Sequence, residues 1–292
     1  MHSPEPVRSR RKYGYGRGRG FRQRVSLAVL MAACLSLAAC ASGATGTSSG
    51  AASIQGDTST SGNGTGSGTG SGNDDMDITL PANIVNLPLL DPSGRTEPLS
   101  SFKSKVIVVS DVMTLCQETC PLDTANLVQA ARAVEKAGLG DQVEFLSVTI
   151  DPQRDTPAQL AAYRQLFAPP PADWATLTGA PDNLAALWKN FGVWSQKVPE
   201  GNPPAKNWLT GATLTYDLDH SDDVFFIDQN LREQTLLDGP AHVAQGTQVP
   251  SALQSFLSGT GHQNLEHPSA DAWTTQQVLQ IISGLVHHSI PQ

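Results

Sequence analysis

The sequence predicts an α/β fold for residues 78–292, because strand patterns and helix patterns alternate along this part of the chain. Two short apolar runs, at residues 106–110 and 143–150, have the length and composition of buried strands. Between them, residues 121–136 carry apolar side chains at helical spacing, which predicts a helix packed on those strands. Roughly 210 residues are enough for one buried core, and no pattern divides them.

The other elements near these strands follow from local signals. Residues 81–99, before the first strand, predict an extra N-terminal hairpin. Gly138 stands just after the first helix, where a C-cap glycine ends many helices. Thr156 and Pro157 have the residue types of an N-cap and a first helical position, so a second helix is expected to begin there.

The C-terminal half completes the predicted sandwich. Helices are expected at residues 182–191 and 273–286. Residues 212–217 and 223–227 predict an antiparallel strand pair. Residues 239–271 look like a C-terminal addition to this core.

The N-terminus has the organisation of an export signal. Residues 1–24 hold eight of the 19 basic side chains and one acid, and the apolar stretch 25–39 is shorter than the roughly 20 residues that span a membrane. This pattern predicts a secretory signal peptide at residues 1–39, with an uncleaved signal anchor as the alternative. The motif Leu37-Ala38-Ala39-Cys40 resembles a bacterial lipobox, which implies cleavage before Cys40 and lipidation of its sulfur.

A linker and an acidic domain are expected after the signal. Residues 40–77 are mainly Gly, Ser and Thr, a composition that cannot bury enough apolar surface to fold and so predicts a flexible tether. Loss of residues 1–39 removes eight of 19 basic and one of 27 acidic side chains, which leaves a net charge of about −15. Such a charge argues against nucleic acid as a partner.

Cys116 and Cys120 carry the strongest chemical signal, because two thiols stand between a buried strand and a helix start. At a spacing of four they are expected on one face of a helical turn, where the helix N-terminus lowers a thiol pKa. The spacing alone fits a structural disulfide, a redox pair or a metal site equally well. Thiols at the end of the first core strand make a thioredoxin-like fold the natural candidate.

A third ligand would favour the metal site, since Cu(I) prefers thiolates and also accepts imidazole. His220 is the best candidate, because it stands in Asp219-His220-Ser221 at the expected turn between two strands, beside groups that can hydrogen-bond its ring. A histidine in a turn is, taken alone, more often a surface residue. The domain has five further histidines: His242, His262, His267, His287 and His288.

Three sequence blocks together resemble the Sco/SenC family of copper-delivery and thiol-redox proteins. They are Cys116-Gln117-Glu118-Thr119-Cys120-Pro121, the segment Ser147-Val148-Thr149-Ile150-Asp151-Pro152-Gln153-Arg154-Asp155-Thr156-Pro157, and Asp219-His220-Ser221. Residues 174–179 are also similar. The resemblance covers roughly residues 80–240, and the order of the blocks makes it specific.

The resemblance implies a thioredoxin-like fold and a copper site formed by Cys116, Cys120 and His220, for Cu(I) and also for Cu(II). It implies a lipid-anchored, extracytoplasmic protein that helps to mature the dinuclear copper centre of cytochrome c oxidase. The implied partners are the oxidase subunit that carries this centre and an extracytoplasmic thiol reductant.

The chain departs from the family pattern at the cysteine loop. Gln117 replaces the usual proline, and Asp111, Val112 and Met113 replace an aromatic-Gly-aromatic run. These changes leave the ligands intact and bear on the surface that meets the client. We expect Arg154 and Asp155 to have a structural role, and His242, His262 and His267 to be solvated loop residues.

Two other functions are compatible with the sequence. A thiol–disulfide reductase acting on a client's cysteine pair would use Cys116 and Cys120 as its redox pair and would not need His220. A binding module would hold Cys116 and Cys120 in a structural disulfide without further chemistry. Copper delivery itself needs no turnover reaction.

Overall fold

The computed structural model describes residues 76–291 of the 292-residue chain. The expected signal peptide, the lipidation site Cys40 and almost all of the expected linker lie outside the described residues. Within residues 76–291, no helix combines the length and the apolar character that crossing a membrane requires.

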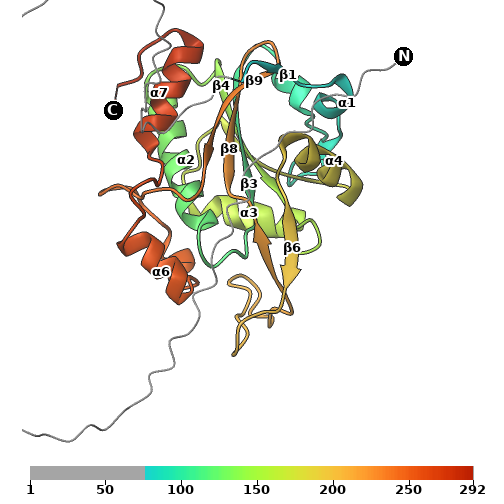
Figure 1. The fold of residues 1–292 in the computed structure, drawn as a ribbon, viewed down its shortest axis with the longest axis vertical. Coiled ribbons are helices and arrows are strands. Elements are labelled where there is room, and N and C mark those ends of the chain that lie inside the picture. The colour runs from blue at the N-terminus through green and yellow to red at the C-terminus, as the bar shows by residue number, and fades with distance from the viewer. Residues whose placement is uncertain (1–75, 292) are drawn as a thin grey trace, which may run out of the picture. The chain divides into compact units, whose positions relative to one another are not determined.

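A mixed sheet forms the centre of the fold (Figure 1). Among the described residues it has seven strands, in the order β1-β9-β8-β3-β4-β5-β2. The strands β3, β4 and β5 are parallel, and β8 and β9 continue the sheet in antiparallel pairing. The strand bounds are β1 Ile78–Thr79, β2 Leu89–Leu90, β3 Val106–Val112, β4 Val143–Thr149, β5 Trp174–Gly179, β8 Asp223–Ile227 and β9 Arg232–Asp238.

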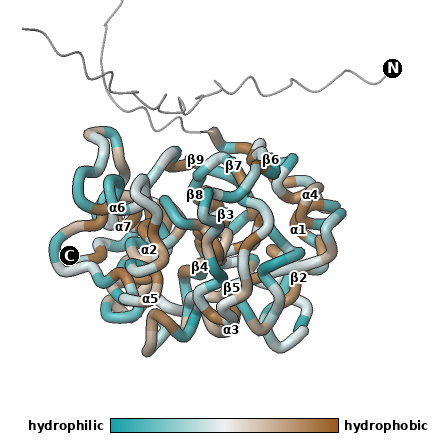
Figure 2. Tube along the Cα trace, turned by 90° about the horizontal axis from the view of Figure 1, so that it is seen from below, coloured by the Kyte–Doolittle hydropathy of each residue, from teal (hydrophilic) through white to brown (hydrophobic). Residues whose placement is uncertain are grey.

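Helices cover both faces of this sheet. Figures 1 and 2 place α2 and α7 on one side, and α1 and α4 on the other. The helix α3 is joined to α2 by Tyr163, whose hydroxyl donates to Thr124 Oγ1 at 2.9 Å. The bounds are α1 Ala82–Val85, α2 Cys120–Lys136, α3 Pro157–Leu166, α4 Pro181–Phe191 and α7 Thr275–Val286, with a short 3₁₀ helix, η1, at Leu99–Phe102.

The topology confirms the predicted thioredoxin-like fold. The parallel unit β3-α2-β4 lies beside the antiparallel unit β8-β9-α7, with β3 next to β8 at the centre of the sheet. Every residue of β3 and β4 is buried, which explains why these strands are nearly continuous apolar runs. The loop that carries Cys116 therefore begins at the end of a strand that is buried along its whole length.

The expected helix boundaries follow their local signals. Thr156 caps α3, because its side chain accepts the Gln159 N–H, and Pro157 is the first helical residue. Gly138 adopts a positive φ of 74° just after α2, a conformation that glycine takes without strain. The C-terminal helix begins at Thr275 rather than at residue 273, because Thr274 and Gln277 form a capping box there.

The predicted antiparallel pair of residues 212–217 with 223–227 is wrong. The strand β8 pairs with β3 and with β9, and β9 was not expected because its sequence Arg-Glu-Gln-Thr-Leu-Leu-Asp is largely polar. The strand before the turn is β7 (Asp217–His220), which pairs with β6 (Ser195–Val198) in a separate two-stranded ribbon.

The segments at both ends of the domain add to the core. The N-terminal segment contains the expected hairpin only as one antiparallel bridge, Leu90–Thr96, while β2 also extends the sheet beside β5. The C-terminal addition carries two helices, α5 (Ser251–Gln254) and α6 (Gly259–Glu266).

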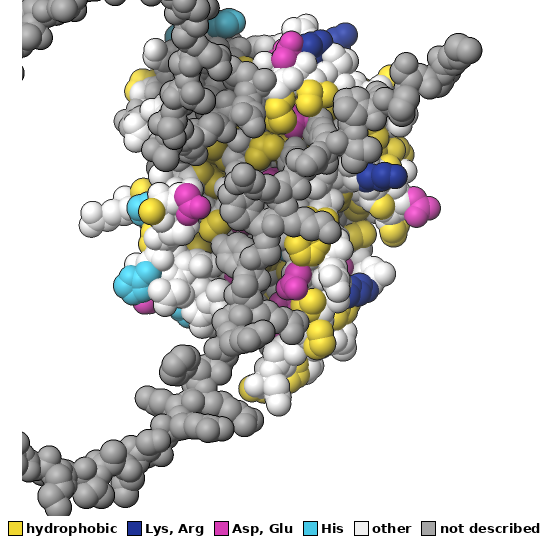
Figure 3. Space-filling view, viewed as in Figure 1, with side chains coloured by type: hydrophobic (Ala, Val, Ile, Leu, Met, Phe, Trp, Pro, Cys, Tyr) yellow, Lys and Arg dark blue, Asp and Glu magenta, His cyan; other side chains and the backbone are white. Residues whose placement is uncertain are grey.

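The charges of the described surface are dispersed. In Figure 3, the basic side chains that are drawn in colour stand apart from one another and are interspersed with acidic ones. This face therefore lacks a continuous basic patch among its coloured residues.

Candidate metal centre

Cys116 and Cys120 lie at the two ends of a tight bend between β3 and α2. Cys120 is the first residue of α2, whereas Cys116 lies in the preceding loop, so the expectation that both share one helical turn is wrong. Pro121 stands in the first turn of α2, where its missing N–H costs no hydrogen bond of the helix. The Cys116 N–H donates to Met113 O at 3.0 Å and the bend returns its sulfur toward that of Cys120.

Thr114 fixes this loop to the rest of the fold. Its N–H donates to Asp155 Oδ1 at 3.2 Å and its hydroxyl donates to the same oxygen, while its carbonyl accepts the Trp208 indole N–H at 2.8 Å. The Thr149 hydroxyl donates to the other oxygen of Asp155 at 2.6 Å. Burial raises the pKa of Asp155 to about 6, although these donors oppose the shift. Asp155 therefore positions the cysteine loop from the start of α3.

His220 reaches the cysteines from the β6–β7 ribbon, at the last residue of β7 and opposite Ser195. Its Nδ1 lies 3.0 Å from Asp111 Oδ2 and 2.5 Å from Ser221 O, and both oxygens can only accept. Nδ1 therefore carries a hydrogen in either charge state, and Nε2 faces Cys120 Sγ at 3.7 Å, where its lone pair is available to a metal ion once the ring is neutral.

Asp111 is fixed in turn by the backbone. Its Oδ1 accepts the Asp223 N–H at 2.9 Å, just beyond the turn that follows His220. One carboxylate thus joins the end of β3, the imidazole and the start of β8. Asp111 was noted in the sequence only as a departure from the family pattern. The signal that could have identified it is a lone charge within the apolar run of β3.

The three predicted ligand residues come together in the structure. One atom from each of Cys116, Cys120 and His220 lies within 4.8 Å of the others, and this is the only such group among residues 76–291. The cysteines are 5% and 2% exposed, the His220 side chain is 6% exposed, and both thiols are free. Two sulfurs and one imidazole nitrogen form a donor set that suits a soft ion such as Cu(I).

The surroundings of the site shift the pKa values of the two thiols in opposite directions. The hydrogen bond with Cys120 lowers the pKa of Cys116 well below its usual value, and the nearby His220 charge and the Glu118 N–H lower it further. The same hydrogen bond, together with burial, raises the pKa of Cys120. Burial alone would lower the pKa of His220, but its hydrogen bond to Asp111 and the Cys116 charge raise it. Cys116 is therefore the more readily ionised thiol of the pair.

Two more carboxyls, the buried Asp123 and the half-buried Asp222, lie in the same region. Burial raises the pKa of both groups, to about 7 for Asp222, and the charge of Asp222 further raises that of Asp123. A raised pKa favours the neutral form, which limits the negative charge around the Cys116 thiolate.

The remaining candidates from the sequence stay outside the cluster. His242, His262 and His267 are not among the grouped ligands, and His262 and His267 are exposed. Histidine side chains (cyan) are visible on the surface in Figure 3, on the flank where Figure 1 draws α6. The Met113 sulfur accepts from Arg154 Nη2 at 3.1 Å, so this thioether has a structural partner.

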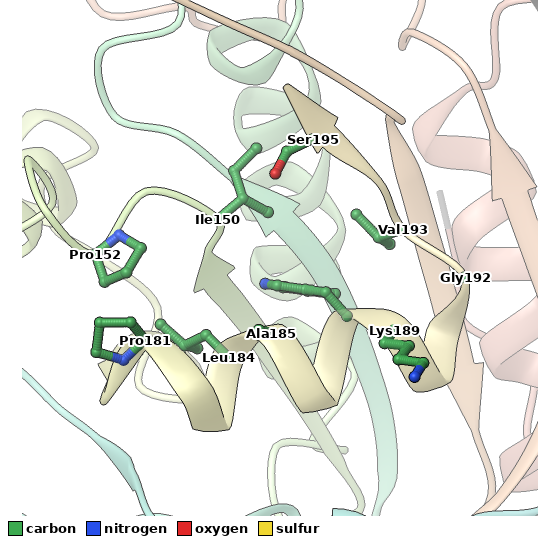
Figure 4. A pocket seen from close by; sticks show the side chains of 10 residues that line it. Ile150, Pro152, Pro181, Leu184, Ala185, Lys189, Gly192, Val193 and Ser195 are labelled. Atoms are coloured by element: carbon green, nitrogen blue, oxygen red, sulfur yellow. The ribbon is translucent and has the colours of Figure 1, made fainter. Parts of the chain in front are cut away.

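A separate groove of about 520 Å³ opens beside β6 (Figure 4). Its lining is mainly apolar, with Ile150, Leu184 and Val193 directed into it, and it contains no thiol or imidazole. The groove meets the ribbon at Ser195, the partner of His220, but the ligand atoms lie elsewhere. The candidate site is thus a buried cluster that does not line this groove.

Comparison with known proteins gives one family. A family model described as SCO1/SenC matches residues 86–253, a range that contains all three clustered ligands. Among curated proteins, the chain is 31% identical over 112 residues to "Protein SCO2 homolog, mitochondrial" of Bos taurus, which covers 38% of this chain and 41% of that protein. It is 30% identical over 138 residues to "Protein sco1" of Schizosaccharomyces pombe, 47% of each chain. The chain spans less than half the length of these two relatives.

Solved structures of Sco proteins are also similar to this chain. ScoI of Bradyrhizobium japonicum, solved with copper bound, is 23% identical with a TM-score of 0.42, over 57% of this chain and 93% of that one. A SCO1/SenC family lipoprotein of Bacillus anthracis is 22% identical with a TM-score of 0.46, over 63% and 95%.

Proposed function

The chain belongs to the SCO1/SenC family, and we propose from this membership and from its site that it binds copper through Cys116, Cys120 and His220 and delivers it to a partner protein. The single observation that carries the proposal is the convergence of two free thiols and one imidazole nitrogen within 4.8 Å. The hydrogen bond from His220 Nδ1 to Asp111 directs the other ring nitrogen toward the sulfurs, as a metal ligand requires.

Cu(I) is the expected cargo, because thiolates are soft ligands and three donors leave the ion accessible to a competing set. Binding requires both thiols to be reduced. If Cys116 and Cys120 form a disulfide, two electrons and two protons leave with an oxidant and both thiolate ligands are lost. Copper occupancy and redox state are therefore coupled, and an extracytoplasmic thiol reductant is the implied partner.

The proposed client is the cytochrome c oxidase subunit that carries the dinuclear copper centre. Support comes from the family relationship, since a similar solved protein, BsSco, is described as a member of the Sco family of cytochrome c oxidase assembly proteins. The proposed location is extracytoplasmic, with Cys40 lipidated on the cell membrane. Its support is the basic, apolar and small-residue sequence of residues 1–40.

An anaerobic Cu(I) titration of the fully reduced protein tests the site. We expect one tight equivalent for the wild type, much weaker binding for Cys116→Ser, and weaker binding for His220→Ala. Exposed His262→Ala, from the same chain but outside the cluster, is the matched histidine control and should bind like the wild type. Tight binding that ignores both Cys116→Ser and His220→Ala would refute the proposal.

A thiol–disulfide reductase is the second candidate, and the lowered pKa of Cys116 favours it. In that reaction the Cys116 thiolate attacks a client disulfide, Cys120 resolves the mixed disulfide, and two electrons and two protons pass to the client's sulfurs. This chemistry does not use His220 as a ligand. A His220→Ala variant that lacks tight copper but reduces a cysteine-pair substrate at the wild-type rate would support the reductase.

A further inference from the structure

The C-terminal addition forms a closed loop, which we call the strap and define as residues 239–273. Its two ends are tied together: Trp273 Nε1 donates to Gly239 O at 2.7 Å, and the His242 N–H donates to Trp273 O at 2.7 Å. A parallel bridge between Ala241 and Trp273 adds to this closure. The strap is therefore an excursion with fixed ends that carries α5 and α6.

The base of the strap rests on the helix that carries Cys120. The Ala241 N–H donates to Asp123 Oδ1 at 2.7 Å, three residues after Cys120 in α2. Just beyond the other end of the strap, Thr275 Oγ1 donates to Asn126 Oδ1 at 2.8 Å, one turn further along α2. Both ends of the strap are thus held at the ligand-bearing part of α2.

The tip of the strap contacts the loop between the two cysteines. The Ser258 N–H, at the start of α6, donates to Gln117 O at 2.8 Å. Gly261, in the first turn of α6, lies so close to the same carbonyl that an added Cβ would be 2.2 Å from Gln117 O. Figure 1 draws α6 below α2, on the side of the cysteine loop. Gln117 is the residue directly after Cys116.

The close contact with the Gln117 carbonyl requires a glycine at position 261, whereas the backbone conformation of α6 does not. Its backbone has no positive φ, so an alanine would suit the helix itself. Gly259, two residues earlier in the same helix, has no atom within 4 Å of an added Cβ. An added Cβ at 261 would also lie 2.9 Å from Leu257 Cδ2, at the flexible end of a side chain within the strap, whereas the Gln117 carbonyl is backbone and cannot turn aside. The two glycines therefore differ chiefly in their contact with the cysteine loop, which makes them a matched pair.

The loop is also held from its other side. Gln117 Nε2 donates to Glu200 Oε1 at 3.1 Å, and Trp208 holds Thr114, both from the segment that joins β6 to β7. Gln117 therefore lies between two segments that approach from different parts of the chain. The almost complete burial of Cys116 and Cys120 is consistent with a loop that is pinned on both sides.

We infer that the strap is a positioning element for the metal-binding loop: docking of α6 on Gln117 holds Cys116 and Cys120 buried in ligand geometry, and its release exposes the thiols. Gly261 and Ser258 are its positioning residues, since they touch Gln117 and no ligand atom. The purpose of this device rests on the proposed copper function. The coupling itself concerns the thiols alone and can be measured without copper.

The first test compares Gly261→Ala with Gly259→Ala in the full-length, reduced protein. Both add one methyl group to the first turn of α6, but Gly261→Ala alone must push α6 away from Gln117 O. We expect thiol alkylation by iodoacetamide in native buffer to accelerate about tenfold in Gly261→Ala and to stay at the wild-type rate in Gly259→Ala. Equal rates in the two variants, with both folded by circular dichroism, would overturn the inference.

A second test needs no variant and so survives misfolding of Gly261→Ala. Coupling is reciprocal, so an adduct that displaces the loop must also loosen the strap. We expect alkylation of both thiols with a bulky maleimide to speed hydrogen exchange at the Ser258 amide about tenfold, while the Ile227 amide in β8 does not change. An unchanged Ser258 amide would show that strap and thiols are independent.

Copper enters only in a third measurement. If the proposed function holds, a competing chelator should remove Cu(I) faster from Gly261→Ala than from Gly259→Ala. Absence of tight copper in the wild type, with the alkylation difference intact, would refute the copper function and leave the strap inference standing. Tight copper with identical alkylation and identical release in both variants would refute the strap alone.

Discussion

The two halves of the site are assembled in different ways. Cys116 and Cys120 are four residues apart on one loop, and a local bend brings their sulfurs together. His220 comes from 100 residues beyond Cys120, and its ring is oriented by Asp111, which is 109 residues before it in the chain. The cysteine half is therefore encoded locally, whereas the histidine half depends on the completed sheet.

This difference teaches which part of the site a sequence motif can carry. A short motif can specify ligands that one loop presents, because their spacing is preserved in any fold that contains the loop. An imidazole from a separate ribbon needs an acceptor to fix its tautomer and direction. Here the acceptor is a charge buried at the end of β3, the strand that also begins the cysteine loop.

Loss of a thiol from the cysteine half should lower the Cu(I) affinity more than any change in the histidine half. Cys120→Ser removes a soft ligand, and we expect the affinity for Cu(I) to fall by more than about 100-fold. Loss of a residue that only orients a ligand costs at most roughly 100-fold, and a ligand itself should cost more. His220→Ala should lose less, because two thiolates still suit Cu(I). Competition titrations with a Cu(I) chelator measure both. A larger loss from His220→Ala than from Cys120→Ser would reverse the ranking of the halves.

Asp111→Asn tests the histidine half without removing a ligand. An amide can present either its oxygen or its nitrogen to Nδ1, so the tautomer and ring direction are no longer fixed. We expect Cu(I) affinity to fall by about 10- to 100-fold, as for other partners that orient a histidine ligand. The neighbouring Ser110, whose hydroxyl lies 3.3 Å from Ser147 Oγ, provides the control. Ser110→Ala should keep the wild-type affinity for Cu(I). Wild-type affinity in Asp111→Asn would show that the imidazole orients itself.

The same contrast between local and long-range signals distinguishes the parts of the fold that the sequence could predict from the parts that it could not. The helix starts at Pro157 and Thr275 depend on caps within three residues, and they were predictable to within two residues. The central strands were predictable because burial on both faces makes them continuous apolar runs. These signals do not depend on distant partners.

The strand errors arose where the partner decides the structure. Strand β9 alternates buried and half-buried positions, but its buried positions include Glu233 and Thr235, so apolar periodicity does not reveal it. Strand β6 is exposed and polar, and nothing in its sequence indicates that it would pair with the segment ending in His220. The contact of Gly261 with Gln117 likewise depends on the docking of a distant loop and has no local signal.

The cysteine half can be loosened through Asp155. Asp155→Ala leaves the buried Thr114 N–H and hydroxyl without their acceptor, and such a loss costs about 1–3 kcal/mol of folding free energy. Since both sulfurs remain, we expect Cu(I) affinity to fall less than in Asp111→Asn. Urea unfolding and a Cu(I) competition titration measure the two effects. Thr149→Val removes only the second donor to Asp155, so it should lower both the stability and the Cu(I) affinity less than Asp155→Ala does. If Asp155→Ala lowered the Cu(I) affinity more than Asp111→Asn, the position of the cysteine loop would matter more than the direction of the imidazole ring.

The smallest effect concerns a carboxyl that belongs to neither half. Burial raises the pKa of Asp173 to about 7 from an ordinary value of 3.8, and neither of its side-chain oxygens has a hydrogen-bond partner among the described residues. A group whose pKa is raised by folding contributes stability that is complete below pH 3.8 and is lost as the pH rises through about 7. We therefore expect Asp173→Asn to flatten the fall in unfolding free energy between pH 5 and pH 8 in the metal-free protein, by urea denaturation, with unchanged Cu(I) affinity. The exposed Asp141→Asn should keep the wild-type slope. If Asp173→Asn also kept it, the pH dependence would have to arise from the other carboxyls whose pKa is raised, which are Glu144 beside Lys105 and the group near the ligands that includes Asp155 and Asp222.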